Sequence, residues 1–294
     1  MDINFELYKV FYHVAKHLSF SEASQELFIS QSAVSQSISL LEKKLNCKLL
    51  FRSTKKVSLS HEGKILFEHI EQGYNFIKSG ERSVLEMHSV VQGDVRIGAS
   101  DTICKYYLLP YLKKFNSQYP NVKIHITNRT SPDCIELLRK GYVDFAVINI
   151  PKNPEYADME VRELKTINDV FIAGKTFEHL KGKKISIKDL KSYPILALEK
   201  NTSTRDFFDN YIKSSNIKVT PEIELGSNDL LIEMAKIGLG ISFVMSFFIE
   251  EYIEKGDIFI LDIKEEIPSR SLGVITHKSI PLTVASRRFI DILG

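Results

Sequence analysis

Hydroxyl and amide side chains dominate residues 31–39, and no charged residue lies among them. Gln can pair both amide atoms with an adenine edge, and Ser can bond a phosphate or any base. The alternative is an ordinary solvated helix face, but this does not explain why the first charge comes only at Glu42. The residues that we expect to contact DNA bases are Gln31, Ser32, Ser35, Gln36 and Ser39.

A basic segment follows directly. Residues 43–56 contain six Lys or Arg and no acidic residue. A run of like charge is usually only a solvated face. Next to a segment suited to base edges, however, it indicates contacts with phosphates, which Lys and Arg neutralise in any sequence. The expected phosphate contacts are Arg52, Lys55 and Lys56.

Three helices and a small wing are predicted to position these residues. Apolar residues recur at helical spacing over 5–18, Ser19 or Ser21 can cap a second helix over 22–27, and Ser30 can cap a third. Two short helices joined by a tight turn form a helix-turn-helix. The segments 48–52 and 55–59 are expected to be the two strands of the wing.

Composition restricts the class of protein. The chain has 294 residues, a net charge of +2, 44% hydrophobic and 26% charged residues, which is typical of a globular protein and favours two domains. Three distant cysteines give no disulfide framework. The longest nearly apolar run, 237–249, is too short to span a bilayer. Acidic residues near the N-terminus do not fit a secretory signal, so we expect a cytoplasmic protein.

Residues 19–63 resemble the winged helix-turn-helix of LysR-type transcriptional regulators. The matching positions include Ser19-Phe20, Ser30-Gln31, Leu41-Glu42 and Leu50-Phe51. Three departures are Ser32 where the family often has Pro, Asn46 where it often has Gly, and Gln36-Ser37 where a basic residue is common. Because of the last departure, we expect Gln31 and Gln36 to make a larger share of the base contacts.

A long helix is predicted after the wing. From Ser60 to about Val91 there is no Pro, and Leu66, Ile70, Gly73, Ile77, Gly80, Val84, Met87 and Val91 recur at a mean spacing near 3.5 residues. This spacing indicates a coiled-coil seam. The alternative is an amphipathic helix packed on its own domain. The resemblance implies a dimerisation helix.

The second half alternates strand and helix patterns, as in an α/β domain. The pattern looks like the two-lobed, periplasmic-binding-protein-like effector domain of the same family. The predicted strands are 95–98, 122–126, 143–148, 194–198, 223–225 and 241–244, and the predicted helices 108–119, 131–141, 205–215 and 229–237. The expected division is 1–60 for DNA binding, 61–91 for the linker helix and 92–294 for the effector domain, with lobe I at 93–163 and 268–294 and lobe II at 164–267.

Two loops are the first candidates for a ligand site. One follows the strand 95–98 and the other precedes the helix 205–215, and ligands of open α/β sheets bind at such places. Hydroxyls and free amide groups there suit a small anion, although each hydroxyl could instead be an ordinary helix cap. In the resembling family the two loops face one another. The expected effector-binding residues are Ser100, Thr102, Thr202 and Ser203, followed by Asn149 and Ser227.

No catalytic or cofactor motif is evident in the sequence, and no cofactor is expected. His13 and His17 are four residues apart, but no third metal ligand can be identified, so we expect no metal site. Cys104 is near a ligand loop without a partner cysteine close in sequence, and a redox role is a remote alternative. A solute-binding receptor or an enzyme could share the two-lobed fold, but neither accounts for residues 1–60.

The sequence therefore predicts a regulator that binds promoter DNA as a dimer or tetramer and is not an enzyme. A small-molecule effector would act from the cleft between the lobes, although a regulator without a ligand remains an alternative. No membrane partner is expected.

Overall fold

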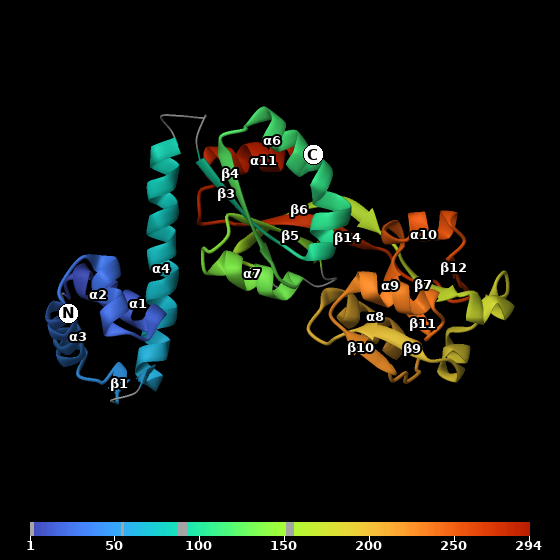
Figure 1. Cartoon of the computed structure of the whole chain (residues 1–294), viewed down its shortest axis with the longest axis horizontal. Coiled ribbons are helices and arrows are strands. Elements are labelled where there is room, and N and C mark those ends of the chain that lie inside the picture. The colour runs from blue at the N-terminus through green and yellow to red at the C-terminus, as the bar shows by residue number, and fades with distance from the viewer. Residues whose placement is uncertain (1–2, 54–55, 87–92, 151–155) are drawn as a thin grey trace. The chain divides into compact units, whose positions relative to one another are not determined.

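The computed structural model describes residues 3–53, 56–86, 93–150 and 156–294. It divides into two compact units, Met1–Glu81 and Arg82–Gly294, and each has its own hydrophobic core (Figure 1). In the described part of the chain, no helix has the length and apolar character needed to cross a membrane.

The first unit begins with three helices: α1 (Phe5–His17), α2 (Phe20–Leu27) and α3 (Gln31–Leu45). Ser19 and Ser30 cap α2 and α3 by accepting hydrogen bonds from the backbone of Glu22 and Ala33, so both predicted caps are confirmed for these helices. Asn46 ends α3 with φ of 52°, a left-handed conformation that Gly, and next Asn, tolerates best. The departure from the family pattern at this position therefore has a physical reason.

The wing and the long helix follow. Strands β1 (Leu50–Arg52) and β2 (Val57–Leu59) are antiparallel, with Leu50 opposite Leu59. Helix α4 runs over His61–Glu86, and the predicted continuation to residue 91 lies outside the described residues. Two of the predicted seam positions, Gly73 and Gly80, have open space where a Cβ would project, and Ile77 and Val84 are exposed.

The second unit contains two sheets. The first has the order β4-β3-β5-β14-β6, in which β3, β4 and β5 are parallel to one another and β14 pairs antiparallel with both β5 and β6. Helices α6 and α11 lie on one side of this sheet and α7 on the other (Figure 1). The bounds are β3 (Gly93–Ala99), α5 (Asp101–Ile103), a π-helix (Cys104–Leu108), α6 (Leu109–Gln118), β4 (Val122–Asn128), α7 (Ser131–Arg139), β5 (Phe145–Ile150), β6 (Met159–Ile167), β14 (Arg270–His277) and α11 (Val284–Leu293).

The second sheet has the order β10-β9-β11-β7-β12, in which β10, β9 and β11 are parallel to one another and β7 pairs antiparallel with both β11 and β12. Its principal elements are β7 (Asp169–Gly174), β9 (Ile195–Leu198), α8 (Ser203–Ser214), β10 (Ile223–Leu225), α9 (Asn228–Lys236), β11 (Ile241–Met245), α10 (Glu250–Glu254) and β12 (Ile258–Ile260). Short 3₁₀ helices at 175–180, 187–192 and 246–248 and the strand pair β8 (Lys184–Ile185) and β13 (Asp262–Ile263) complete this lobe.

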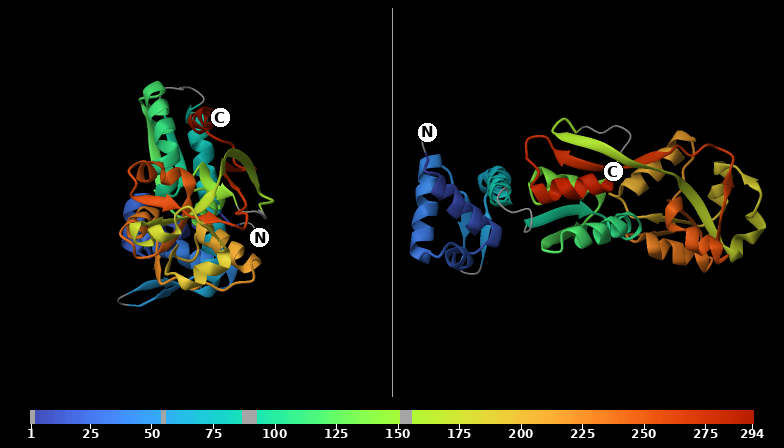
Figure 2. Two further views of the ribbon diagram at one scale, coloured as in Figure 1. Left: turned by 90° about the vertical axis from the view of Figure 1, so that its right-hand side faces the viewer. Right: turned by 90° about the horizontal axis from the view of Figure 1, so that it is seen from above.

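The chain passes twice between the two sheets, after β6 and before β14. These two strands pair along their length, from Arg270 opposite Ile167 to His277 opposite Met159, and Figure 2 shows them running side by side. The lobe limit expected at 163/164 falls within β6. The predicted strands and helices of both lobes are present. Further elements, among them β6, β14 and α11, were not predicted; β6 has a mostly exposed pattern without clear alternation.

Candidate DNA-binding surface and ligand cleft

One face of α3 carries all five residues predicted to contact bases. Gln31, Ser32, Gln36 and Ser39 are exposed, Ser35 is half-buried, and their spacing places them on the same side of the helix. The opposite side, with Val34, Ile38 and Leu41, is fully buried in the core of the unit. The polar side is therefore accessible to an external partner, while packing of the apolar side in the core fixes the position of the helix.

The cationic residues that were predicted to contact phosphates belong to the wing. Arg52 is exposed at the end of β1, and its guanidinium lies 4.1 Å from the centre of the Phe20 ring, which links the wing to the start of α2. Lys56 is also exposed, and its backbone amide donates to the hydroxyl of Ser53 at the tip of the wing. Lys55 lies outside the described residues.

A buried carboxylate fixes the wing to α3, a role that no local sequence pattern indicates. Glu42 accepts hydrogen bonds from Lys48 Nζ at 2.7 Å and from the backbone amides of Leu49 and Leu50 at 2.9 and 3.3 Å. Burial raises the pKa of Glu42, but these hydrogen bonds outweigh burial, and the net effect lowers the pKa. The charged form of Glu42 is thus the form that the fold requires.

Residues from both lobes surround a polar cavity of about 210 Å³. It lies at the N-terminal ends of α7 and α8, where the first backbone N–H groups of each helix have no partner within the helix. Five of the six predicted effector-binding residues line it, whereas Ser227 does not and instead caps α9. The five are Ser100, Thr102, Asn149, Thr202 and Ser203.

Three of these hydroxyls already have structural roles. Ser100 caps α5, and Thr202 caps α8 by accepting from the amide of Arg205 at 3.2 Å. The hydroxyl of Thr102 accepts from Asn228 Nδ2 at 3.1 Å, a buried bond between the two lobes. Ser203, the first residue of α8, is the predicted hydroxyl that lines the cavity without a hydrogen-bond partner in the described part of the chain.

Two amide oxygens in the cavity wall have no partner. Among the described residues, Asn149 Oδ1 and Asn228 Oδ1 are buried and accept no hydrogen bond. A buried acceptor without a donor is unfavourable by about 1–3 kcal/mol. A ligand carrying hydroxyl or amine donors would satisfy them. Asn228 was not predicted as a site residue, although it directly follows the capping Ser227 in the sequence.

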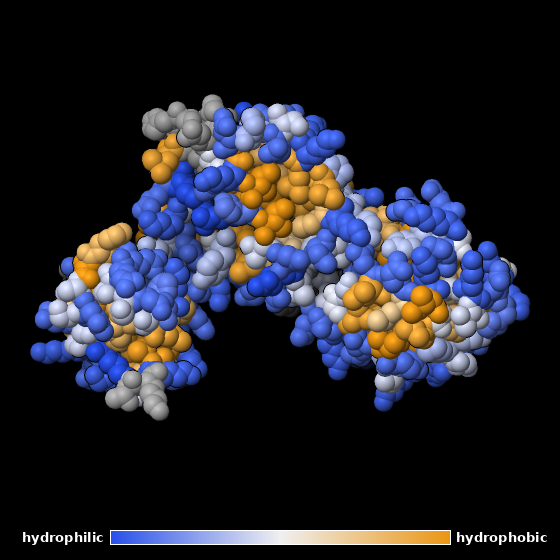
Figure 3. Space-filling view, viewed as in Figure 1, coloured by the Kyte–Doolittle hydropathy of each residue, from blue (hydrophilic) through white to orange (hydrophobic). Residues whose placement is uncertain are grey.

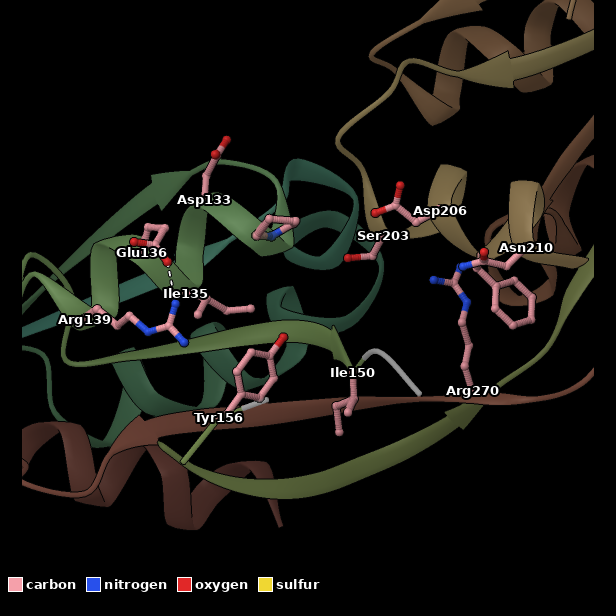
Figure 4. Close-up of a pocket in the computed structure, with 12 residues that line it drawn as sticks. Asp133, Ile135, Glu136, Arg139, Ile150, Tyr156, Ser203, Asp206, Asn210 and Arg270 are labelled. Atoms are coloured by element: carbon pink, nitrogen blue, oxygen red, sulfur yellow. Dashed lines mark hydrogen bonds and ion pairs between the residues drawn. The ribbon is translucent and has the colours of Figure 1, made fainter. Parts of the chain in front are cut away.

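A larger and more apolar cavity of about 430 Å³ shares Asp133 and Ser203 with the polar one. Figure 4 shows Ser203 and Asp206 on α8 at one side and Asp133, Glu136 and Arg139 on α7 at the other. Arg139 is paired with Glu136 at 2.6 Å. Burial, together with the charge of Asp209, raises the pKa of Asp206.

Beside this cavity, a buried ion pair joins the first residue of β7 to the first residue of β14, at the two crossovers between the lobes. Arg270 donates to both carboxylate oxygens of Asp169 at 2.6 and 2.7 Å, and to the Thr204 hydroxyl at 2.9 Å. The side chains of Arg270 and Asp169 are 4% and 0% exposed. This pair was not predicted, because its members are 101 residues apart and no local pattern connects them.

Cys104 has no features of a reactive thiol. Burial raises its pKa to about 11, so the nucleophilic thiolate is scarce at neutral pH. This favours a packing role over the redox alternative.

Both halves of the chain match models of known protein families. Residues 5–64 match the bacterial regulatory helix-turn-helix model of the lysR family, and residues 88–294 match the LysR substrate binding domain model. A probable RuBisCO transcriptional regulator from Thalassiosira pseudonana is 29% identical over 280 residues, which cover 92% of this chain and 90% of that protein.

Two solved structures share the fold. Full-length CbnR in a complex with its target DNA has a TM-score of 0.67 at 17% identity, and 99% of each chain is covered. The regulatory domain of CcmR from Synechocystis PCC6803, in complex with 2-PG, has a TM-score of 0.63 at 24% identity and covers 69% of this chain and 96% of that one. Both domain models together cover nearly the whole sequence, and the chain belongs to the LysR family of DNA-binding transcriptional regulators.

Proposed function

We propose that α3 and the wing bind promoter DNA, and that a small anion bearing hydrogen-bond donors binds in the polar cavity and changes this binding. The cavity at the N-termini of α7 and α8 is the observation that carries the effector proposal. Helix N-termini attract anions because the aligned peptide dipoles and the free N–H groups both favour negative charge.

The walls of the cavity support this class of ligand. The amides of Ser203 and Thr204 lie in the first turn of α8, and the Ser203 hydroxyl lies beside them. The unpaired oxygens of Asn149 and Asn228 call for donors at the other end of the ligand. A small hydroxylated carboxylate or phosphate meets both requirements. Because Thr102 and Asn228 already bond across the cleft, a ligand there would act on a contact between the lobes.

Self-association completes the proposal. One winged helix contacts a single half-site, and dimers bind two. Helix α4 exposes Ile77 and Val84, and Figure 3 shows hydrophobic residues gathered over α9, where Leu230 and Ile237 are exposed. We infer that these surfaces pair with further copies of the chain, as a dimer or tetramer. We also infer action by binding rather than catalysis, in the cytoplasm, because the curated relatives carry the names of transcriptional regulators.

Fluorescence anisotropy with a labelled duplex from upstream of the chain's own gene tests the proposal. Affinity is measured with small carboxylates, phosphates and sulfate, and with the matching neutral amides and alcohols. At least one anion should change the affinity while its neutral partner does not. Ser203→Ala should weaken this response, whereas Ser214→Ala, at the other end of α8, should leave it unchanged. Equal responses to anions and neutral compounds, or equal behaviour of the two variants, would contradict the effector proposal.

A further inference from the structure

Two histidines and a carboxylate converge where α1 meets α2. His13 Nδ1 lies 3.1 Å from Glu26 Oε2, and His17 Nε2 contacts the same oxygen. One ligand atom from each of the three residues lies within 4.8 Å of the others. The two histidines are evident in the sequence but the third ligand is not, because Glu26 belongs to the next helix and only the fold brings it to them.

The helical positions explain the convergence. His13 and His17 are four residues apart on α1 and therefore lie on the same face. Glu26 is in the last turn of α2, which packs against α1. His13 is buried, while His17 and Glu26 are partly open to solvent. The cluster thus has a fixed inner ligand and an accessible outer edge.

The remaining nitrogen of each imidazole already has a partner. His17 Nδ1 lies 3.2 Å from Glu22 Oε2, and His13 Nε2 lies 3.4 Å from the hydroxyl of Tyr74 on α4. Metal-binding histidines generally hold their second nitrogen in this way, most often through a carboxylate or another oxygen. If these nitrogens carry the protons, the nitrogens that face Glu26 present lone pairs.

With the ring protons on these outer nitrogens, the three atoms that face one another are all acceptors, and a bound cation would satisfy them. Among the described residues, His13 Nδ1 is buried and makes no aligned hydrogen bond, although Glu26 Oε2 is near. Lys16 Nζ lies 3.2 Å from Glu26 Oε1 and so occupies the other carboxylate oxygen. Lys16 is largely exposed and leaves Oε2 to the two imidazoles.

We propose that His13, His17 and Glu26 bind one divalent transition metal of the zinc class, with the fourth position open to water. Two imidazoles and one carboxylate are a ligand set that zinc accepts in proteins, with a tetrahedral arrangement. The metal would fasten α1 to α2 directly before the DNA-contacting helix α3. Its binding would therefore stabilise the DNA-binding unit, because the unfolded chain does not hold the ligands together.

Zinc chloride titrated into the chelator-treated full-length chain tests the proposal, with affinity measured by calorimetry and Co²⁺ absorption as an independent signal of tetrahedral coordination. The expected result is one metal per chain at this site and a higher melting temperature of the wild type with zinc. Glu22→Ala should weaken binding about 10–100-fold, as loss of an outer partner does. His17→Ala and Glu26→Gln should each weaken it more.

His69→Ala is the matched control, because His69 is an exposed histidine of the same unit, on α4. It should bind zinc like the wild type. Far-ultraviolet circular dichroism of each metal-free variant checks that the helices are intact; His17 and Glu26 were chosen over the buried His13 for this reason. The proposal is overturned if wild type binds no zinc, if His17→Ala and Glu26→Gln bind it as the wild type does, or if His69→Ala loses it equally. The last outcome would identify adventitious surface binding.

Discussion

The DNA-contacting face of α3 and the ligand cleft use similar side chains in opposite ways. On α3, the side chains of Gln31 and Gln36 are exposed, while Val34, Ile38 and Leu41 of the same helix are fully buried and hold it in the core. In the cleft, Thr102 and Thr202 already serve in an interlobe bond and a helix cap. Recognition and stability are therefore separable in the first region and coupled in the second, and this difference can be tested.

The largest expected effect is at the crossovers of the second unit. Asp169→Asn removes the charge that compensates the buried Arg270, and breaking one partner of such a pair destabilises by about 3–5 kcal/mol. Hydrogen exchange followed by mass spectrometry should show faster exchange in β7 and β14 and unchanged exchange in α1 to α3. The double replacement Asp169→Leu with Arg270→Met should recover much of the loss. Equal destabilisation of both units would contradict their independence.

Glu42 is the corresponding test in the first unit. Glu42→Gln should destabilise this unit by about 1.5–3 kcal/mol, the range for hydrogen bonds to charged groups. Because the folded-state pKa of Glu42 is lowered, its contribution is present above the ordinary value of 4.5 and is lost as pH falls below that value. The free energy of unfolding of the wild type, measured between pH 7 and 3, should fall on the acid side, and Glu42→Gln should not show this fall. Parallel pH curves for the two proteins would refute this role.

Base and phosphate contacts should separate on α3 and the wing. Gln36→Ala should lower discrimination between the preferred site and a one-base variant by about 1–3 kcal/mol. Lys56→Ala should weaken all sequences alike and reduce the dependence of log affinity on log salt by about one. Binding titrations on both duplexes at several salt concentrations measure the two effects. If the two variants change the same quantity, the assignment of their roles is wrong.

The smallest effect concerns the coupled roles in the cleft. Thr202→Val should lose the cap of α8, a change of about 1 kcal/mol, together with any response to an effector. Thr202→Ser keeps the hydroxyl and should keep both properties. DNA affinity without effector should stay at the wild-type value in both variants. A Thr202→Val protein with normal stability would show that the hydroxyl has no capping role.

Local patterns in the sequence predicted much of the fold. Ser30 caps α3 as predicted, and Ser19 is the cap of α2 among the two candidates. Thr202 and Ser227 are caps as well, which was the alternative to their expected place in the ligand site. The four helices begin within one or two residues of the predicted positions. These elements could be predicted because a cap and the apolar spacing after it lie within a few consecutive residues.

Features that depend on distant residues could not be predicted. Arg270 meets Asp169 from 101 residues away, and Glu26 joins His13 and His17 only because α2 folds back on α1. Strand β14 pairs with β6 through a register shift at Leu272 and Gly273, which no alternation pattern reveals. In the cleft, the hydroxyls were predicted, but the unpaired oxygen of Asn228 could be recognised only once its surroundings were known.

Nuclease footprinting on DNA immediately upstream of the chain's own gene tests the central claim most directly. The wild type should protect a two-part site, as expected for two recognition helices in successive major grooves. The double variant Gln31→Ala with Gln36→Ala should lose this protection and retain only weak, sequence-independent binding. If the wild type protects no site here or in a genome-wide pool of fragments, or if the double variant gives the same footprint, α3 is not the element that reads DNA sequence.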